Sequence, residues 1–205
     1  MKTVEIIGFK RANLGKKAAK SLRKESMVPC VLYGGKDQVH FNVPMILFKN
    51  LVYTPKALMV DLNVEGTKYK AILQEVQFHP VNELILHADF LELNDSKQIR
   101  MDIPIKFVGA AIGLQRGGKL ITKLKKASVK ALPNDMPDVI EVDVTALDLG
   151  KSVRISEIPK AAYTILNSPL ITIASIGIPR GLKTEESAAP AKGAAKAPAK
   201  AAPKK

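Results

Sequence analysis

Alternation of apolar and polar residues with a period of two runs through most of this chain and constrains its fold more than any other feature. Between Ile99 and Phe107 every second residue is apolar, and Arg100, Asp102, Pro104 and Lys106 lie between them. Successive side chains of a strand point to opposite sides, so this alternation is typical of strands that bury one face. Helices of about 10–15 residues do not alternate with these segments, which argues against a doubly wound α/β sheet. The fold class that we expect is mainly β.

Similar patterns, rich in Ile, Val and Thr, predict strands in both halves of the chain. We expect strands at residues 4–9, 29–33, 58–64, 68–76, 84–93, 99–107, 140–144, 152–158 and 169–178. The segment 64–67 is a hairpin signal, because Gly66 can adopt a positive φ. One helix is predicted after Val43, with Pro44 in its first turn. Its expected apolar face comprises Ile46, Leu47, Leu51 and Val52.

A polar cluster at residues 94–97 lies between two apolar stretches and predicts a domain boundary. We expect one β-rich domain at residues 1–95, a second at 96–183 and a disordered basic tail at 184–205. The tail contains nine Ala, five Lys and three Pro but no large apolar residue, so burial cannot offset its ordering entropy. Two roles remain open for it, a purely solubilising one and non-specific contact with nucleic acid.

The net charge of +13, from 32 Lys and Arg against 19 Asp and Glu, favours an anionic partner. A membrane is a weak candidate for that partner, because the longest nearly unbroken apolar run, residues 170–178, is far shorter than the roughly 20 residues that span a bilayer. The N-terminus shows no apolar export signal. Cys30 is the single cysteine, which excludes an intramolecular disulfide framework and a cysteine-based zinc cluster. We expect a soluble, cytoplasmic protein.

The cations are concentrated in one short segment that contains no acidic residue. Within 15 residues the chain carries Lys10, Arg11, Lys16, Lys17, Lys20, Arg23 and Lys24. A helical turn would direct Ala18 and Leu22 inward and the cations outward. Such a cluster binds a phosphate backbone with release of counterions. The alternative, an ordinary solvated face, is disfavoured by the absence of compensating acids.

Two enzymatic hypotheses arise from other residues. The segment from Gly113 to Lys119 has the spacing of a phosphate-binding loop, but Leu120 replaces the required hydroxyl and a strand replaces the helix, which excludes nucleotide hydrolysis. His79, His87 and Asp89 could converge in a hairpin and hold a metal, as in a metallohydrolase. No zinc-hydrolase spacing supports that second alternative.

Several ordered motifs extend over both halves of the chain. In the first half they are Arg11-x3-Gly-Lys-x5-Leu-Arg23, Val28-Pro-Cys-Val-Leu-Tyr-Gly-Gly35, Val76-Gln-Phe-His-Pro80 and Leu86-His-Ala-Asp-Phe90. In the second half they are Pro104-Ile-Lys-Phe-Val-Gly109, the 113–118 loop, Val129-Lys-Ala-Leu-Pro133, Asp135-x-Pro137, Glu141-Val-Asp143 and Leu147-x-Leu-Gly150. In their order and spacing these motifs resemble the large-subunit ribosomal protein twenty-five family, which binds 5S rRNA, in its long form, the Ctc general stress protein. The resemblance covers about 180 residues.

The resemblance implies an N-terminal six-stranded type of β-barrel, similar to the anticodon-binding barrel of glutaminyl-tRNA synthetase, and a mostly β C-terminal Ctc domain. It implies a structural, non-enzymatic role in the large ribosomal subunit, with binding to an irregular internal loop of 5S rRNA in the central protuberance. Neighbouring rRNA and ribosomal proteins are the other implied partners, and neither a cofactor nor a small-molecule substrate is expected. An irregular loop exposes its base edges to a protein, whereas the major groove of regular A-form RNA is too deep and narrow for side chains to reach them. A stress-related protein that binds RNA off the ribosome remains the main alternative.

The resemblance also implies roles for single residues. Arg11, Lys16 and Arg23 match phosphate and groove contacts, and the basic segment adds Lys17, Lys20 and Lys24. The other implied contacts are an aromatic near the RNA, Tyr33, and the hairpin polar residues Gln77, His79, His87 and Asp89. A purely structural pairing of His87 with Asp89 is the alternative there. Three departures, Ala19, Ser21 and Phe78, stand where the family usually has Ser, Arg and often a basic residue, and they bear on affinity.

Overall fold

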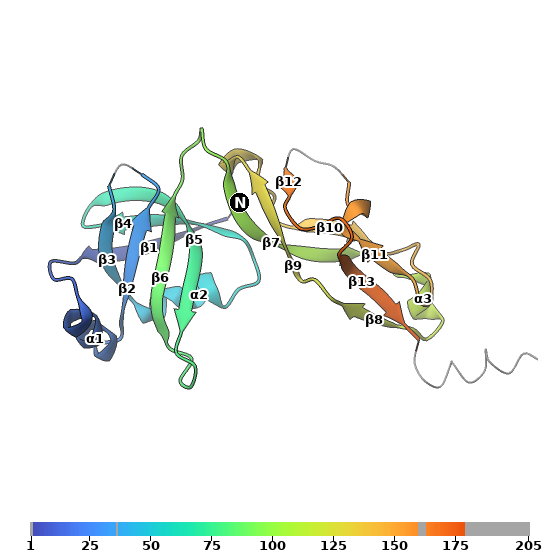
Figure 1. Ribbon diagram of the computed structural model, residues 1–205, viewed down its shortest axis with the longest axis horizontal. Coiled ribbons are helices and arrows are strands. Elements are labelled where there is room, and N and C mark those ends of the chain that lie inside the picture. Colours follow the sequence, from blue (N-terminus) through green and yellow to red (C-terminus); the bar gives the residue numbers. More distant parts are fainter. Residues whose placement is uncertain (1, 36, 160–162, 179–205) are drawn as a thin grey trace, which may run out of the picture.

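The structure, a computed structural model, describes residues 2–35, 37–159 and 163–178. Its first part is a closed barrel with the strand order β1-β3-β2-β6-β5-β4, seen at the left of Figure 1. The strands are β1 (Lys2–Lys10), β2 (Met27–Tyr33), β3 (Val39–Pro44), β4 (Leu58–Val64), β5 (Thr67–Phe78) and β6 (Ile85–Glu92). The expectation of a six-stranded barrel is confirmed.

Alternation places every second residue of these strands inside the barrel. In β4, Leu58, Val60, Leu62 and Val64 are buried, whereas the residues between them are half-buried. Phe90 is the centre of an aromatic cluster, with its ring centroid 5.7 Å from that of Phe41 and 6.3 Å from that of Phe48. Removal of this apolar surface from water supplies the main stabilisation of the barrel.

The barrel closes through strand pairs that are distant in sequence. β1 runs parallel to β4 and antiparallel to β3, and β2 runs parallel to β6. The predicted hairpin between β4 and β5 is confirmed: Glu65 and Gly66 both have positive φ, as a tight two-residue turn requires. The Asn63 side chain accepts a hydrogen bond from the Gly66 amide at 3.0 Å.

Helices cover only part of the barrel. They are α1 (Lys16–Lys24), the 3₁₀ turn η1 (Met45–Phe48) and α2 (Lys49–Val52). The helix predicted after Val43 therefore exists, but the expected position of Ile46 on its buried face is wrong, because that side chain is 77% exposed. The 3₁₀ start rotates the first turn relative to an α-helix, and Phe48 is buried in place of Ile46.

The second part of the chain consists of two small sheets with the orders β10-β7-β9-β12 and β11-β13-β8. Their strands are β7 (Ile99–Val108), β8 (Lys119–Thr122), β9 (Lys126–Ala131), β10 (Ile140–Asp143), β11 (Ser152–Arg154), β12 (Thr164–Ile165) and β13 (Thr172–Gly177). The helical turns are α3 (Ile112–Gln115), η2 (Pro133–Asp135) and η3 (Ile155–Glu157). The mainly β fold class is confirmed.

One predicted strand of this second part, residues 152–158, is wrong over its second half. The chain leaves the sheet after Arg154, where the register with β13 shifts, and turns into η3. Ile155 and Ile158 are both buried although they are three residues apart. That spacing buries both side chains from a 3₁₀ turn, whereas a strand would place them on opposite faces.

The barrel and the second part share a continuous apolar core. Ile72 of β5 and Ala57 point away from the barrel interior and are buried in the same cluster as Ile99 and Ile103 of β7. Leu91 of β6 packs against this cluster as well. The two parts are therefore held against each other by buried side chains and not only by a linker.

Two further expectations concern the C-terminal tail and membrane-spanning segments. The predicted disordered tail at 184–205 lies outside the described residues. In the part of the chain that the structure covers, no helix combines the length and apolar character needed to traverse a bilayer.

Candidate nucleic-acid interface

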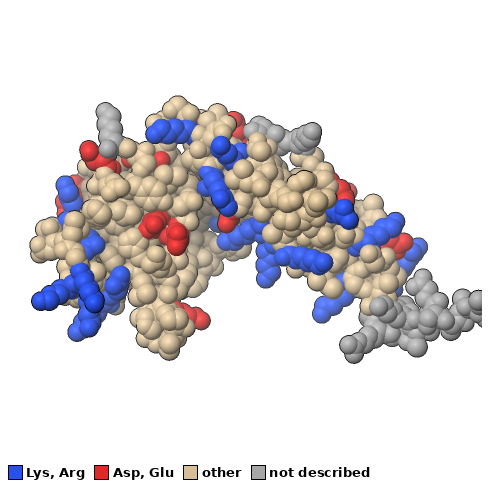
Figure 2. Space-filling model, viewed as in Figure 1, with Lys and Arg blue, Asp and Glu red and all other residues tan. Residues whose placement is uncertain are grey.

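α1 carries a dense cationic face on the outside of the barrel. Ala18, Ala19 and Leu22 are half-buried on the opposite side, and the helix packs against β2. The five cations of the helix are exposed, and in the described part of the chain none of them takes part in an ion pair; they are Lys16, Lys17, Lys20, Arg23 and Lys24. Figure 2 shows this cluster at the lower left. The predicted amphipathic helical segment is confirmed.

Arg23 connects the helix to the β5–β6 hairpin. Its Nε donates a hydrogen bond to the main-chain oxygen of Leu86 in β6, at 3.0 Å, across 63 residues of sequence. This bond fixes the guanidinium at the junction of α1 and β6, and leaves its terminal nitrogens available to an acceptor. The cationic face and the hairpin are thus parts of one surface.

Arg11 lies deeper than the sequence suggested. Its side chain is half-buried, its Nη2 donates to the Asn13 carbonyl at 3.3 Å, and its Nε is buried without a hydrogen-bond partner among the described residues. Its backbone amide donates to the carbonyl of His40 in β3, at 3.0 Å. Arg11 therefore offers less accessible surface to a phosphate than the lysines of α1.

Most of the predicted hairpin residues meet on the outer face of β5 and β6. Gln77 lies directly across from His87, and Glu75 lies across from Asp89. The Nδ1 of His87 is 2.6 Å from Oδ1 of Asp89, and both side chains are about 30% exposed. Tyr33 of β2 borders them: burial raises the pKa of its hydroxyl, and the carboxylates of Asp89 and Glu75 raise it further.

His79 is held apart from that cluster, in the turn that joins the two strands. Its Nδ1 accepts hydrogen bonds from the amides of Val81 and Asn82, each at 3.3 Å. An Nδ1 that accepts must be unprotonated, so in the neutral ring the proton is on Nε2. The side chain therefore presents a hydrogen-bond donor at Nε2.

The arrangement contradicts the metal-site alternative built on His79, His87 and Asp89. Nowhere in the described ranges do three or more His, Cys, Asp or Glu side chains gather as metal ligands would. The Nδ1 lone pair of His79 is occupied by backbone amides, and a ligand nitrogen needs that lone pair free.

Glu75 is the residue of this face that the sequence analysis missed. The register of β5 against β6 shifts between Leu73 and Glu75 and again between Gln77 and Phe78. Such bulges change which side chains share a face. Between the two shifts the register is regular, so alternation from Gln77 to Glu75 and from His87 to Asp89 could have placed Glu75 beside Asp89.

Cys30 lies inside the barrel beneath this face and is 1% exposed. Burial raises the pKa of its thiol, and the nearby Asp89 carboxylate adds to the increase. Its Sγ donates to the Val28 carbonyl at 3.4 Å. Cys30 therefore behaves as a small buried apolar residue.

The raised pKa of Cys30 should make the protein less stable at alkaline pH. In the unfolded chain the thiol ionises near its ordinary pKa of about 8.5, whereas the folded protein keeps it neutral. The unfolded state then binds fewer protons, so the free energy of unfolding falls by up to ~1.4 kcal/mol per pH unit above that value. Urea unfolding between pH 7 and pH 10 should show a shallower decline for Cys30→Ala. Equal declines would contradict the prediction.

Two family profiles match the chain. The Ribosomal L25p family matches residues 6–90, and the C-terminal domain of ribosomal protein TL5 matches residues 98–180. Proteins named large ribosomal subunit protein bL25 are similar over most of the chain. The protein from Cytophaga hutchinsonii is 56% identical over 189 residues, with 92% of this chain and 98% of that protein covered. Those from Amoebophilus asiaticus and Porphyromonas gingivalis are 54% and 42% identical, covering 94% and 89% of this chain and 98% and 96% of their own length.

Proposed function

The chain belongs to the Ribosomal L25p family, and from this membership we propose that it is a structural protein of the large ribosomal subunit that binds 5S rRNA. Relatives across nearly their whole length are named as large-subunit ribosomal proteins, so we place this protein on the ribosome in the bacterial cytoplasm. Its partners there are rRNA and neighbouring ribosomal proteins. The family's role is structural and not enzymatic.

The binding face that we propose combines α1 with the β5–β6 hairpin. The single observation that carries this proposal is the Arg23–Leu86 hydrogen bond, which holds the cations of α1 beside the polar outer face of the hairpin. Phosphate contacts position a protein on a nucleic acid, and contacts to base edges provide the sequence discrimination. Adjacent cationic and polar surfaces supply both functions to one RNA segment.

The polar residues of the face suit an irregular RNA helix. Gln77 presents an amide, which donates and accepts, and His79 presents its Nε2–H donor. Base edges are accessible to such groups where the pairing is irregular and the groove is widened, as at an internal loop. We infer that α1 contacts phosphates of 5S rRNA and that the hairpin reads base edges in its internal loop, in the central protuberance of the subunit.

We also propose that residues 1–95 form the RNA-binding domain and residues 96–183 a separate domain. The separate matches of the two family profiles, at residues 6–90 and 98–180, support a boundary between residues 90 and 98. The shared core around Ile72 means that the isolated first domain exposes an apolar surface that the full chain buries. Experiments on RNA binding therefore use the full chain.

Comparison of Lys20→Ala with His79→Ala tests the division between phosphate contact and base reading. Lys20→Ala should weaken binding to 5S rRNA and to an unrelated RNA duplex by similar factors, and lower the slope of log affinity against log salt by about 0.7–0.9. His79→Ala should leave the slope nearly unchanged and cost about 1–3 kcal/mol for the internal-loop RNA alone. Equal slopes and equal selectivity in the two variants would contradict the proposed reading role of the hairpin.

Sedimentation separates the ribosomal role from the off-ribosome alternative. In a sucrose gradient at physiological salt, the protein should co-migrate quantitatively with large subunits. A protein that stays in the free fraction would instead act off the ribosome, as the stress-related alternative requires.

A further inference from the structure

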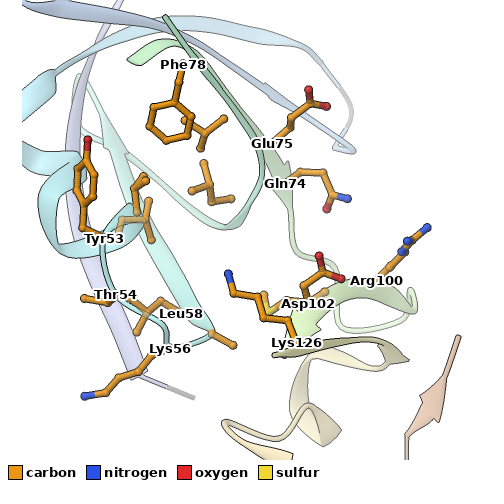
Figure 3. A pocket seen from close by; sticks show the side chains of 16 residues that line it. Tyr53, Thr54, Lys56, Leu58, Gln74, Glu75, Phe78, Arg100, Asp102 and Lys126 are labelled. Atoms are coloured by element: carbon orange, nitrogen blue, oxygen red, sulfur yellow. The ribbon is translucent and has the colours of Figure 1, made fainter. Parts of the chain in front are cut away.

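A groove of about 690 Å³ lies between the barrel and the second part of the chain, away from α1. Figure 3 shows its two walls. Tyr53 and Phe78 stand on the barrel side, and Arg100, Asp102 and Lys126 come from β7 and β9 on the opposite side. Lys126 extends its ammonium group into the space between the walls. The combination of open aromatic rings and cations distinguishes this groove from the α1 face.

The aromatic wall leaves two large rings in contact with solvent. Tyr53 follows α2 and is 63% exposed, and Phe78 ends β5 and is 43% exposed. Phe78 follows the register shift after Gln77 and lines the groove. Exposed aromatic rings at the mouth of a concave site are surfaces on which flat ligands stack.

The opposite wall carries two cations, Arg100 and Lys126, beside one carboxylate, Asp102. Arg100 of β7 lies directly across from Lys130 of β9, and like charges in that arrangement destabilise a sheet. Among the described residues, Arg100 donates to the Ser128 hydroxyl, at 3.5 Å, and that hydroxyl donates to the Asp102 carboxylate. Asp102 keeps its negative charge in this hydrogen bond, so the groove holds Lys56, Arg100 and Lys126 against Glu75 and Asp102, an excess of one positive charge.

The groove is formed in the free protein. Its two walls are joined beneath by the shared core, in which Ile72 of β5 and Ile103 of β7 are fully buried. A site whose walls are already fixed loses little conformational entropy when a ligand binds. The groove also adjoins the proposed RNA-binding face, since Gln77 and Phe78 are consecutive residues of β5.

We propose that this groove binds an unpaired segment of RNA, with bases stacked on Tyr53 and Phe78 and phosphates against Arg100 and Lys126. Stacking platforms beside a cationic track are the arrangement by which proteins hold single-stranded nucleic acid without reading its sequence. An acidic peptide would satisfy the cations but would leave both rings exposed. The site is separate from the α1 face, and its occupancy does not depend on recognition of the internal loop.

Binding of a ten-nucleotide oligouridylate, which has no stable secondary structure, tests the proposal on the full chain. The α1 variant with Lys17, Lys20 and Lys24 replaced by Ala serves as the background, so that the remaining affinity reports the groove. In it, Tyr53→Ala and Phe78→Ala should each weaken binding roughly five- to 100-fold, the range for loss of one stacked base. Tyr53→Phe should retain the affinity, because the ring remains. Arg100→Gln should lower the salt slope by about 0.7.

Matched controls lie outside the groove. Phe9 of β1 is 48% exposed, so Phe9→Ala removes a comparable ring, and Lys106→Gln removes an exposed cation of the same β7 strand. Both controls should bind as the background does. Losses in the controls equal to those of Tyr53→Ala and Arg100→Gln would overturn the proposal. It would also be overturned if an oligoglutamate peptide, and not the oligouridylate, responded to the groove variants.

Discussion

Replacement of Lys17, Lys20 and Lys24 together by Ala should weaken binding to 5S rRNA roughly 100-fold at 0.15 M salt. All three side chains are exposed on α1 and form no ion pair with the described residues, so each is free to displace a counterion from a phosphate. Loss of three such contacts lowers the salt slope by about 2–2.7 units, which corresponds to about two decades in affinity relative to 1 M salt. Filter binding or fluorescence anisotropy across a salt series measures both quantities.

The control for that triple variant has the same change in net charge at other positions. Lys49, Lys68 and Lys70 are exposed on α2 and β5, and their replacement by Ala should reduce affinity several-fold at most through the overall field. If the control variant bound 5S rRNA as weakly as the α1 variant, net charge and not the α1 face would determine binding. The α1 variant should still sediment as a folded monomer with an unchanged melting temperature, because no buried group is altered.

Ile72→Ala should be the most destabilising of the single substitutions considered for this protein. The side chain is fully buried between the barrel and the second part of the chain, so truncation leaves a cavity in the shared core. Such substitutions cost about 2–5 kcal/mol, which corresponds to a fall of roughly 4–20 °C in melting temperature for a chain of this size. Calorimetry measures the change.

Ile7→Ala is the matched control for Ile72→Ala. It removes the same atoms from a β1 side chain that is 57% exposed, and should change stability by no more than ~0.5 kcal/mol. If Ile72→Ala were equally mild, the two parts of the chain would be stable without their common core. The two walls of the groove would then be free to move, and weaker binding by Tyr53→Ala or Phe78→Ala would not report the loss of a stacked base alone.

Local patterns explain why so much of the barrel could be predicted. The strand over residues 58–64 is predicted to the residue, because alternation is strict and Gly66 marks the turn. β3 was missed: Val39, Phe41 and Val43 alternate with His40 and Asn42, but the pattern spans only five residues before Pro44 ends it. Asn42 is nevertheless buried at 9% exposure. Tertiary packing overrides the polarity of a single residue there, which no local pattern reveals.

The candidate site also has some features that the local sequence predicts and others that depend on residues distant in sequence. The α1 cations are predictable because they lie within one nine-residue helix. The bond from Arg23 to Leu86 is not, because it joins residues that only the barrel topology brings together. The sequence could not indicate the groove either. The groove exists because Ile72 points out of the barrel and packs against the second part of the chain. Alternation shows which face of a strand a residue occupies, but not what that face packs against.

The closure of the barrel also determines the order in which its surfaces can form during synthesis. α1 is complete at residue 24, whereas β6, which pairs with β2 and holds Arg23, ends only at residue 92. Parallel pairs such as β1–β4 and β2–β6 require long loops to close first, so they form slowly compared with a local helix. A nascent chain therefore exposes a bare polycation before the hairpin beside it exists. On the proposed function, its attraction to RNA during that interval is that of charge alone, and only the finished barrel places the polar hairpin beside the same helix.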